Sequence, residues 1–387
     1  MPLVSRLVVL TLLAVPSIAA TGSGSLPQAI QDIARQADQA QASDHLADAI
    51  KLYQKGLALD SKWNQGWWAL GSILYDQDRF PEAQTAFRQF VTLSPNPGPG
   101  YAFLALCEYE TGAYDNSLQH FRRWASKGWT GTPQLIDVGV FHFALLLSRE
   151  GSFIPALYLL SAEVQKSYSG PSLIEAMGLA SLRMQNVPEE YPPERREAVW
   201  LAGEAAYYAA VHPADFVHAN EFGDRLAAHY DQTPNVHYFL GTLRKFQSDY
   251  AGAAKEYERE LQISPKHAAA LIELARLAAD DGRLEQAVAL AKQAAALEPN
   301  NPEAHGVFGD VLLRSGEAQQ SLSELEVAKR LAPDSASVRF QLATAYRKLH
   351  RTADADRETK AFNLLKDRQQ VMASPQEKLK GAPELLK

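Results

Sequence analysis

Large apolar, small and polar residues follow one another along this chain in an order that returns every 34 residues. The stretch 67–80, WWALGSILYDQDRF, has counterparts at 101–114, 271–284 and 305–318. In each of them apolar residues recur at intervals of three and four, which predicts a helix with one buried face. No stretch shows the alternation of apolar and polar residues that is typical of a strand. We therefore expect a chain made of repeated helical units.

Each unit has an anchor residue, a small residue four positions later, and a second small residue twelve positions after that. The anchors are Trp67, Tyr101, Leu271, His305 and Arg339, and the small residues are Gly71, Ala105, Ala275, Gly309 and Ala343, then Ala83, Ser117, Ala287, Ser321 and Ala355. Small side chains allow two antiparallel helices to approach closely, where larger ones would push them apart. We expect Trp67 to lie in the core with Gly71, and Phe80 to begin the second helix and pack back on both.

Polar patches and prolines mark the ends of these helices. DQD, ETG, DDG and RSG lie between the two helices of a unit, where they favour a tight turn. A proline cannot continue a helix, so prolines end the second one. They are Pro95, Pro265, Pro299 and Pro333. The pattern predicts antiparallel helix pairs joined by short turns.

These features resemble the tetratricopeptide repeat family, whose unit carries a large residue, Leu-Gly, a tyrosine, an alanine, an aromatic residue and a final proline. Residues 64–97 match this pattern at Trp67, Leu70, Gly71, Tyr75, Ala83, Phe87 and Pro95. The units 234–267, 268–301, 302–335 and 336–369 follow in register. The resemblance implies an all-α fold, an α-solenoid of antiparallel helix pairs.

The pattern divides the chain into six segments. Residues 1–20 form a predicted signal peptide and 21–29 a flexible leader. Residues 30–170 form an N-terminal block of about four repeats, and 234–369 a C-terminal block of four. Residues 171–233 are predicted to be an irregular helical segment with the proline-rich insertion NVPEEYPPERRE, and 370–387 a loose tail. Whether 171–233 is one interrupted repeat or a separate helical insertion stays open.

The first twenty residues, MPLVSRLVVLTLLAVPSIAA, have one arginine, a short apolar stretch and a small-residue end. This layout is typical of a secretory signal peptide, with cleavage after Ala19 or Ala20. A membrane span needs about 20 apolar residues, so we expect none after cleavage. The predicted location is outside the cytoplasm, periplasmic or secreted. The alternative is a segment that is retained as an N-terminal anchor.

Charge and cysteine content exclude several classes of protein. The net charge is −7 and the sequence has no long basic run, so nucleic acid is not an expected partner. Cys107 is the single cysteine, which excludes an intramolecular disulfide and a zinc site built from cysteines. It lies within the apolar pattern of LALCEY, so we predict a small core residue.

Motifs for catalysis or phosphate binding are absent from the sequence. The densest histidine region is VHPADFVHANEF, with His212, Asp215, His218 and Glu221. Pro213 places His212 at a helix start, so we interpret these residues as helix caps and surface groups. We predict no catalytic residue, no metal site, no cofactor and no enzymatic activity.

The resemblance also implies where a ligand would bind, because ligands of this family commonly lie in a groove lined by the first helices of successive repeats. The groove candidates carried over by position are Trp68, Tyr75, Phe103, Tyr109, Phe141, His142, Tyr238, Phe239, Arg276, Arg314, Arg347 and Lys348. We expect the aromatic N-terminal half to supply most of the binding energy, with Trp68 first, and the charged half to orient the ligand. The alternative is that the aromatic residues serve only to stack the repeats.

Three functions remain open at this point. The first is an exported scaffold or adaptor that binds a protein or peptide in the groove. The second is a structural subunit of a cell-envelope or secretion assembly. The third is an enzyme with a site in the irregular segment. The asparagines that certain members of the family use to hold peptides are absent here, because the equivalent positions carry Ala69, Phe103, His142, Phe239, Glu273, Val307 and Gln341. The sequence therefore names no partner.

Overall fold

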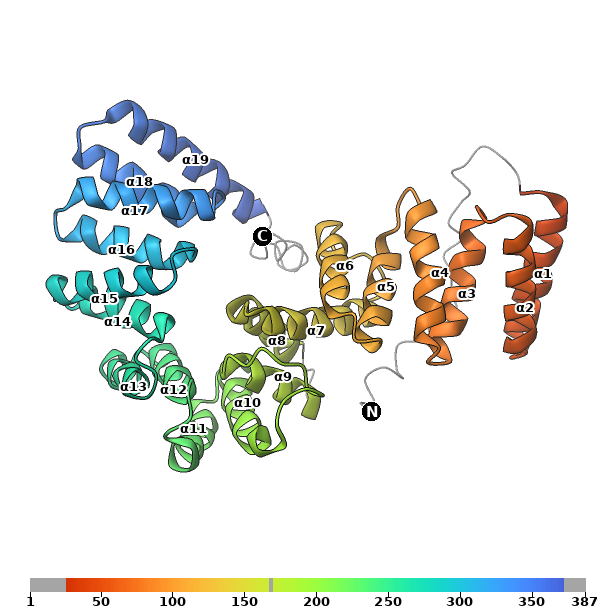
Figure 1. Cartoon of the computed structure of the whole chain (residues 1–387), viewed down its shortest axis with the longest axis horizontal. Helices are drawn as coiled ribbons and strands as arrows, with labels where there is room; N and C mark the ends of the chain where they lie inside the picture. The colour runs from red at the N-terminus through yellow and green to blue at the C-terminus, as the bar shows by residue number, and fades with distance from the viewer. Residues whose placement is uncertain (1–25, 167–169, 372–387) are drawn as a thin grey trace. The chain divides into compact units, whose positions relative to one another are not determined.

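The computed structural model describes residues 26–166 and 170–371, and every regular element in these ranges is a helix (Figure 1). The predicted signal peptide at 1–20 lies outside the described residues. Of the predicted tail at 370–387, only 370–371 are described, and they end the last helix. The all-α fold is confirmed, with helix pairs in series as in an α-solenoid. The described chain divides into two compact units, 26–166 and 170–371.

The first unit consists of four helix pairs, and each pair packs against the next one along the chain. The helices are α1 (Gln28–Ala42), α2 (Leu46–Leu59), α3 (Asn64–Asp76), α4 (Phe80–Leu93), α5 (Gly98–Glu110), α6 (Tyr114–Ser126), α7 (Pro133–Glu150) and α8 (Phe153–Gln165). From α3 to α5 and from α4 to α6 the helix starts are 34 residues apart. The predicted period is therefore the period of the helix pairs.

The second unit begins with irregularly spaced helices and continues with four regular pairs. The irregular helices are α9 (Pro171–Ser181), η1 (Pro193–Arg195), α10 (Arg196–Ala210) and α11 (Phe216–Tyr230). The regular ones are α12 (Val236–Phe246), α13 (Tyr250–Ile263), α14 (Ala268–Asp280), α15 (Leu284–Leu297), α16 (Pro302–Arg314), α17 (Ala318–Leu331), α18 (Ala336–Lys348) and α19 (Thr352–Val371). Besides pairing with its own second helix, α14 packs on α16 and α16 on α18.

The turn inside each pair ends on a residue with left-handed backbone geometry. In seven pairs these residues recur every 34 positions, at Asp44, Asp78 and Gly112 and at Ser248, Gly282, Gly316 and His350, with φ from 57° to 91°. In the pair α7–α8 the residue is Gly151, with φ of 100°. The following N–H then bonds back to the first helix, as Arg79 N does to Leu74 O at 2.9 Å. This is the Schellman arrangement, which satisfies carbonyls at the end of a helix. DQD, ETG, DDG and RSG each end on such a residue, so the predicted turns are confirmed.

The small residues admit the partner helix as the sequence predicts. A Cβ atom at Gly71 would lie 3.0 Å from the ring of Phe87, and one at Gly241 would lie 2.6 Å from the ring of Tyr257. The second small residue, such as Ala83, is fully buried. The aromatic ring that meets Gly71 is thus Phe87, whereas Phe80 contacts Tyr75 with ring centroids 5.5 Å apart. The prediction that Phe80 packs on the glycine was wrong, because the ring that does so, Phe87, lies about two helical turns further along α4.

Three of the anchor residues link successive pairs. Each of these three donates a hydrogen bond to the backbone carbonyl six residues earlier: Trp67 Nε1 to Ser61 O at 2.8 Å, His305 Nε2 to Pro299 O at 3.0 Å, and Arg339 Nη2 to Pro333 O at 2.9 Å. These carbonyls follow the end of a helix, where backbone acceptors lack a partner in the helix. Trp67 is therefore half-exposed, and the expectation that it fills the core was wrong. Leu271, by contrast, is buried in the core.

The irregular segment contains one very close helix contact. A Cβ atom at Gly178 of α9 would lie 1.9 Å from Val199 O, and one at Gly203 of α10 would lie 2.0 Å from Ile174 O. Helices α9 and α10 thus form a pair whose backbones touch, although a long connection separates them in sequence. Helix α11 packs on α10 and on α12. The segment 171–233 is a helix pair with an extended connection, followed by a single helix.

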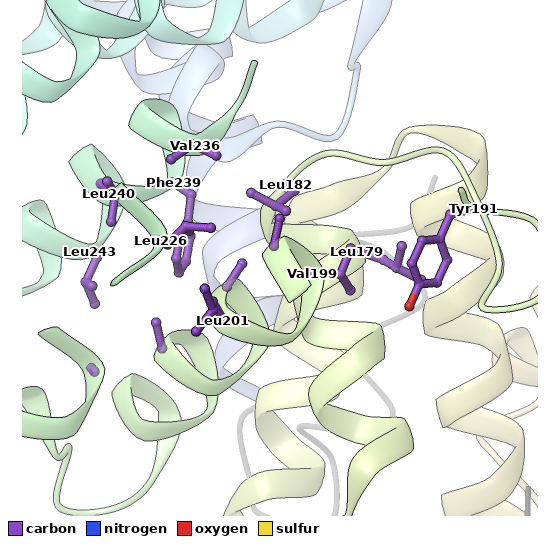
Figure 2. Close-up of a cluster of buried hydrophobic side chains, with 14 residues drawn as sticks. Leu179, Leu182, Tyr191, Val199, Leu201, Leu226, Val236, Phe239, Leu240 and Leu243 are labelled. Atoms are coloured by element: carbon purple, nitrogen blue, oxygen red, sulfur yellow. The ribbon is translucent and has the colours of Figure 1, made fainter. Parts of the chain in front are cut away.

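A continuous apolar cluster joins this segment to the regular pairs that follow. It contains Leu179 and Val199 at one end and Leu226, Phe239 and Leu243 at the other, all of them buried (Figure 2). The connection contributes Tyr191, which is 7% exposed and donates its hydroxyl hydrogen bond to Glu175. The proline-rich insertion is consequently attached to the core through Tyr191.

Candidate functional site

The aromatic groove candidates of the first unit lie in the packing between its repeats. Tyr75, Phe103, Tyr109 and Phe141 are between 3% and 7% exposed. Trp68 is half-buried, and its ring centroid lies 5.5 Å from that of Phe103. Burial raises the pKa of the Tyr75 hydroxyl far above its usual value. These aromatic rings present little surface to a ligand, and the stacking role that the sequence left open accounts for their contacts.

The remaining aromatic candidates and His142 also contact other residues of their own unit. His142 is 8% exposed, its Nδ1 lies 2.8 Å from Val138 O, and burial lowers its pKa to about 4. In the second unit, Phe239 is buried and Tyr238 is half-buried, with its ring stacked on His267 at a centroid distance of 4.9 Å. These positions, like those of the first unit, serve the packing of adjacent pairs.

The charged candidates of the second unit are held by ion pairs that run across its first helices. Lys245 Nζ lies 2.6 Å from Glu273, and Arg276 bridges Glu273 at 3.0 Å and Glu303 at 2.8 Å. Burial by itself lowers the pKa of Arg276, but the two carboxylates outweigh burial and raise it above its usual value. The two cations and the two carboxylates on α12, α14 and α16 are therefore paired with one another.

Arg314, Arg347 and Lys348 also have partners within the second unit. Arg314 lies 2.8 Å from Asp280 and donates a further hydrogen bond to the carbonyl of Ala279. Arg347 donates to the hydroxyl of Thr359, and Lys348 to the carbonyl of Leu313. Cations that are already paired are poor receptors for an anionic ligand, because binding would break an existing contact.

A cavity of about 490 Å³ lies on the surface formed by α12, α14, α16 and α18, which we call the first-helix face of the second unit. Ala279, Val307, Val311 and Val338 form its apolar walls. Its charged lining consists of Arg276, Asp280, Glu303, Asp310 and Arg314. The volume lies within the range of about 300–1,000 Å³ that is typical of ligand sites. The charged half of the predicted groove therefore contains a cavity, although the sequence prediction assigned this half a secondary role.

Asp310 and Gln341 bring acceptor atoms without a partner to this cavity. Asp310 forms no hydrogen bond or ion pair with any part of the chain that the structure describes. The side-chain oxygen of Gln341 is buried and accepts no hydrogen bond. Leaving a buried acceptor unsatisfied costs about 1–3 kcal/mol, so a ligand that donates to it recovers free energy. The cavity therefore offers acceptors to a ligand.

The cavity exists because one repeat has small side chains where others have aromatic rings. Gly306 occupies the repeat position of Trp68, Tyr238 and Phe340, and Val307 occupies that of Phe103 and Phe239. A Cβ atom at Gly306 would have one neighbour within 4 Å, Val338 Cγ2 at 3.8 Å. Comparing the repeats position by position at 306 and 307 is the sequence signal that could have located this site.

A second, smaller cavity of about 180 Å³ lies in the first unit between α6 and α7. Arg149 and Tyr114 both line it, and the guanidinium carbon of Arg149 lies 4.8 Å from the ring centroid of Tyr114. The volume is below the usual range for a ligand site. We therefore take the cavity on the first-helix face of the second unit as the candidate functional site.

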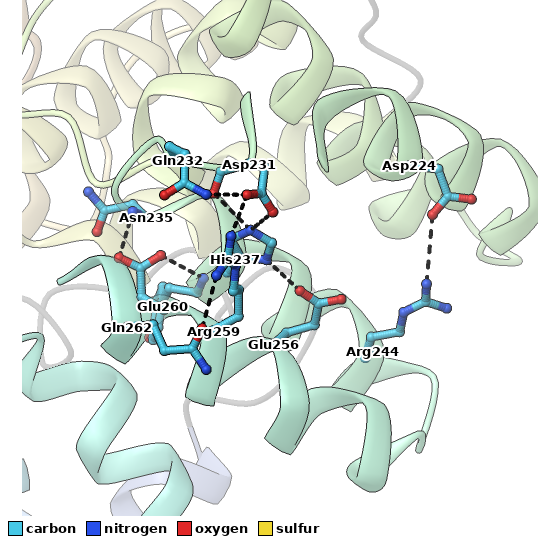
Figure 3. Close-up of polar contacts among 11 residues, drawn as sticks. Asp224, Asp231, Gln232, Asn235, His237, Arg244, Glu256, Arg259, Glu260 and Gln262 are labelled. Carbon is cyan, nitrogen blue, oxygen red and sulfur yellow. Dashed lines mark hydrogen bonds and ion pairs between the residues drawn. The ribbon is translucent and has the colours of Figure 1, made fainter. Parts of the chain in front are cut away.

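A group of titratable side chains lies where α11 meets α12 and α13 (Figure 3). Glu260 is fully buried and accepts hydrogen bonds from Asn235 N at 2.9 Å and Tyr238 N at 3.3 Å, at the start of α12. A carboxylate at this end of a helix is favoured by the helix dipole. His237 contacts Glu256 at 2.6 Å and Asp231 at 3.1 Å. These contacts hold the irregular segment against the first regular pair.

The histidine region of the sequence contributes a helix cap. Asp215 accepts a hydrogen bond from His218 N at 3.2 Å, and its second oxygen lies 2.6 Å from His218 Nδ1. This agrees with the interpretation of these residues as caps.

Within residues 26–166 and 170–371, no three His, Cys, Asp or Glu side chains are grouped as a metal site requires, and no helix has the length and apolarity to cross a membrane. Cys107 is fully buried, and burial raises the pKa of its thiol.

Comparison with known proteins identifies repeats in both units. Models of the tetratricopeptide repeat match residues 34–97 and 69–132, and residues 247–307 and 278–339. A curated relative, the protein CTR9 homolog of Arabidopsis thaliana, is 20% identical over 337 residues. The alignment covers 74% of this chain, and the chain spans only 30% of the length of that relative.

Comparison with solved structures gives matches of low identity and low TM-score. A double mutant of MamA RS-1 is 16% identical and has a TM-score of 0.40, covering 45% of this chain and 96% of its own. YrrB, described as a TPR protein with an unusual peptide-binding site, is 18% identical with a TM-score of 0.34, covering 38% of this chain and 76% of its own. Together with the matched models, the helix pairs described above show that this chain carries tetratricopeptide repeats at residues 34–132 and 247–339.

Proposed function

We propose that this chain is an exported, non-enzymatic scaffold that binds a segment of another protein on the first-helix face of its second unit. Tetratricopeptide repeats suggest a scaffold for protein–protein interaction. The observation that carries the proposal is the cavity of about 490 Å³ lined by α14, α16 and α18, with two acceptors that have no partner. Three successive repeats contribute to it, as expected for an extended ligand that crosses them.

The ligand is assigned to the second unit because the equivalent face of the first unit is filled by its own side chains. Phe103 and Tyr75 are buried against each other, with ring centroids 5.3 Å apart. A ligand there would have to displace aromatic contacts that hold the repeats together. At the second unit it would enter space that is already open.

A partner-capture experiment tests the scaffold function. The full chain and its Gly306→Phe variant are used as bait in the envelope fraction of the cells that produce the protein. We expect Gly306→Phe to fill the cavity, because the same repeat position holds an aromatic residue in other repeats, and so to lose a partner that the unchanged chain retains. Tyr158→Ala, which removes an exposed ring from α8 in the first unit, is the control and should retain the partner.

The export part of the proposal rests on the pattern of residues 1–20. N-terminal sequencing of the protein recovered outside the cytoplasm should begin at residue 20 or 21. A chain that starts at Met1 in a soluble cytoplasmic fraction would contradict export. Retention of the same partners by Gly306→Phe would contradict binding at the cavity.

A role as a structural subunit of an envelope assembly is the second candidate, and exposed apolar side chains favour it. Val217 is 79% exposed, Phe246 70% and Tyr250 56%. Asn220 and Gln247 exchange hydrogen bonds of 3.1 and 2.8 Å, which tie α11 to the turn that carries the two aromatic residues. Partners that are lost with Phe246→Ser and kept with Gly306→Phe would support this second role.

A further inference from the structure

We propose that the cavity between α14, α16 and α18 receives a lysine or arginine side chain of the bound segment. The inference rests on the proposed function and names the residue type that this site selects. It starts from the space that Gly306 and Val307 leave where other repeats carry aromatic rings. That space opens on the face where a crossing segment would lie, so one side chain of the segment fits into it.

The charge of the cavity selects a cation. Arg276 is paired with Glu303, and Arg314 with Asp280, at 2.8 Å in both cases. Among the charged residues of this lining, all of which the structure describes, Asp310 alone has neither an ion pair nor a hydrogen bond. The lining thus carries one carboxylate that has no cation within ion-pair distance. A lysine or arginine side chain supplies a positive charge opposite this carboxylate, together with N–H groups that donate hydrogen bonds to it.

The remaining surface of the cavity fits the rest of such a side chain. Val307, Val311 and Val338 offer apolar contact to an aliphatic stem, and the buried oxygen of Gln341 offers a second acceptor. Long basic side chains bind in this way, with the stem on apolar surface and the charged group on acceptors. An acidic side chain would face Asp310 and would find both arginines already paired.

Selection from a random dodecapeptide library on the full chain tests the inference without a known partner. We expect enriched peptides to share a lysine or arginine at one fixed register. Asp310→Asn removes the charge and keeps the shape, so the basic position should lose its enrichment. Asp356→Asn, an exposed acid on α19, is the control and should keep it.

Affinity measurements on one enriched peptide make the test quantitative. Replacing its basic residue by norleucine, which keeps the stem and removes the charge, should weaken binding about tenfold, as expected for a hydrogen bond to a charged group. Asp310→Asn should weaken binding by a similar factor, and the two changes together should cost little more than either one. Circular dichroism melting of each variant shows whether a loss of binding reflects a loss of folding.

Two outcomes separate this inference from the proposed function. Peptides that are enriched without a basic position, or with an acidic one, would overturn the basic-side-chain inference while leaving a peptide-binding scaffold in place. The absence of any enriched peptide on a folded chain would count against the proposed function itself. Additive effects of norleucine and Asp310→Asn would show that the basic residue binds elsewhere.

Discussion

The first helices of the two units use the same repeat geometry for different purposes. In the first unit, Trp68 and Phe103 occupy two adjacent repeat positions, and their rings pack against Phe87. In α16 of the second unit the same two positions hold Gly306 and Val307, and a cavity of about 490 Å³ lies there. The 34-residue period is the same in both places, so the size of the side chains at these two positions distinguishes the packed core from the open site.

The largest expected effect is on the stability of the aromatic core. Phe103→Ala should destabilise the first unit by about 3–5 kcal/mol, because it removes a ring that is 3% exposed and contacts several others. Val307→Ala at the equivalent position should cost about 1.5 kcal/mol, at about 0.8 kcal/mol for each methyl group removed. Denaturant unfolding of the two variants measures both values, and equal losses would contradict the difference between the units.

A second pair of substitutions tests the close approach of paired helices, which the two units share. Ala83→Leu and Ala287→Leu should each destabilise the fold by about 1–3 kcal/mol, because both alanines are fully buried between paired helices. The same loss is expected in both units, since the close approach of the two helices is common to all regular pairs. An unchanged melting curve for either variant would show that the helices do not need a small residue there.

Two glycines on one helix should respond to alanine in opposite directions. At Gly309 a Cβ atom would lie 2.5 Å from Leu325 Cγ, so Gly309→Ala should destabilise the second unit. At Gly306 the added atom meets only ordinary contact distances, so the better helix propensity of alanine should stabilise by up to about 1 kcal/mol. Thermal melting of both variants checks the sign, and destabilisation by Gly306→Ala would mean that the cavity is smaller than described.

The smallest expected effect is the pH dependence that His237 contributes to the stability of the second unit. Burial lowers the pKa of His237, but Glu256 and Asp231 outweigh it, so the pKa of the folded state is raised above its usual value of about 6.5. The stabilisation is therefore complete below that value and is lost as the pH rises through the folded-state pKa. His237→Leu, which copies Leu271 of the next repeat, should remove this slope. Denaturation midpoints between pH 5.5 and 8.5 measure it, and an unchanged slope would assign the dependence to another group.

The helix pairs could be predicted from the sequence because each of their signals is local. A left-handed turn residue at Gly282 or Gly316, or a small residue at Ala83, acts within one 34-residue unit. Which of the two rings, Trp67 or Trp68, packs against the neighbouring repeat could not be predicted in this way. Both are large and apolar, and only the neighbouring pair shows that Trp68 packs on Phe103 while Trp67 bonds to a preceding carbonyl.

The sequence by itself determined the period, the turns, the small positions and the repeat type. It also supplied the position of every groove residue along its helix. The tertiary structure alone decided which of these residues are covered, because burial depends on side chains from adjacent repeats. It likewise decided that Arg276 and Arg314 are paired while Asp310 is not. An ion pair or a cavity requires groups from α14, α16 and α18 to meet in space, and no single repeat contains that information.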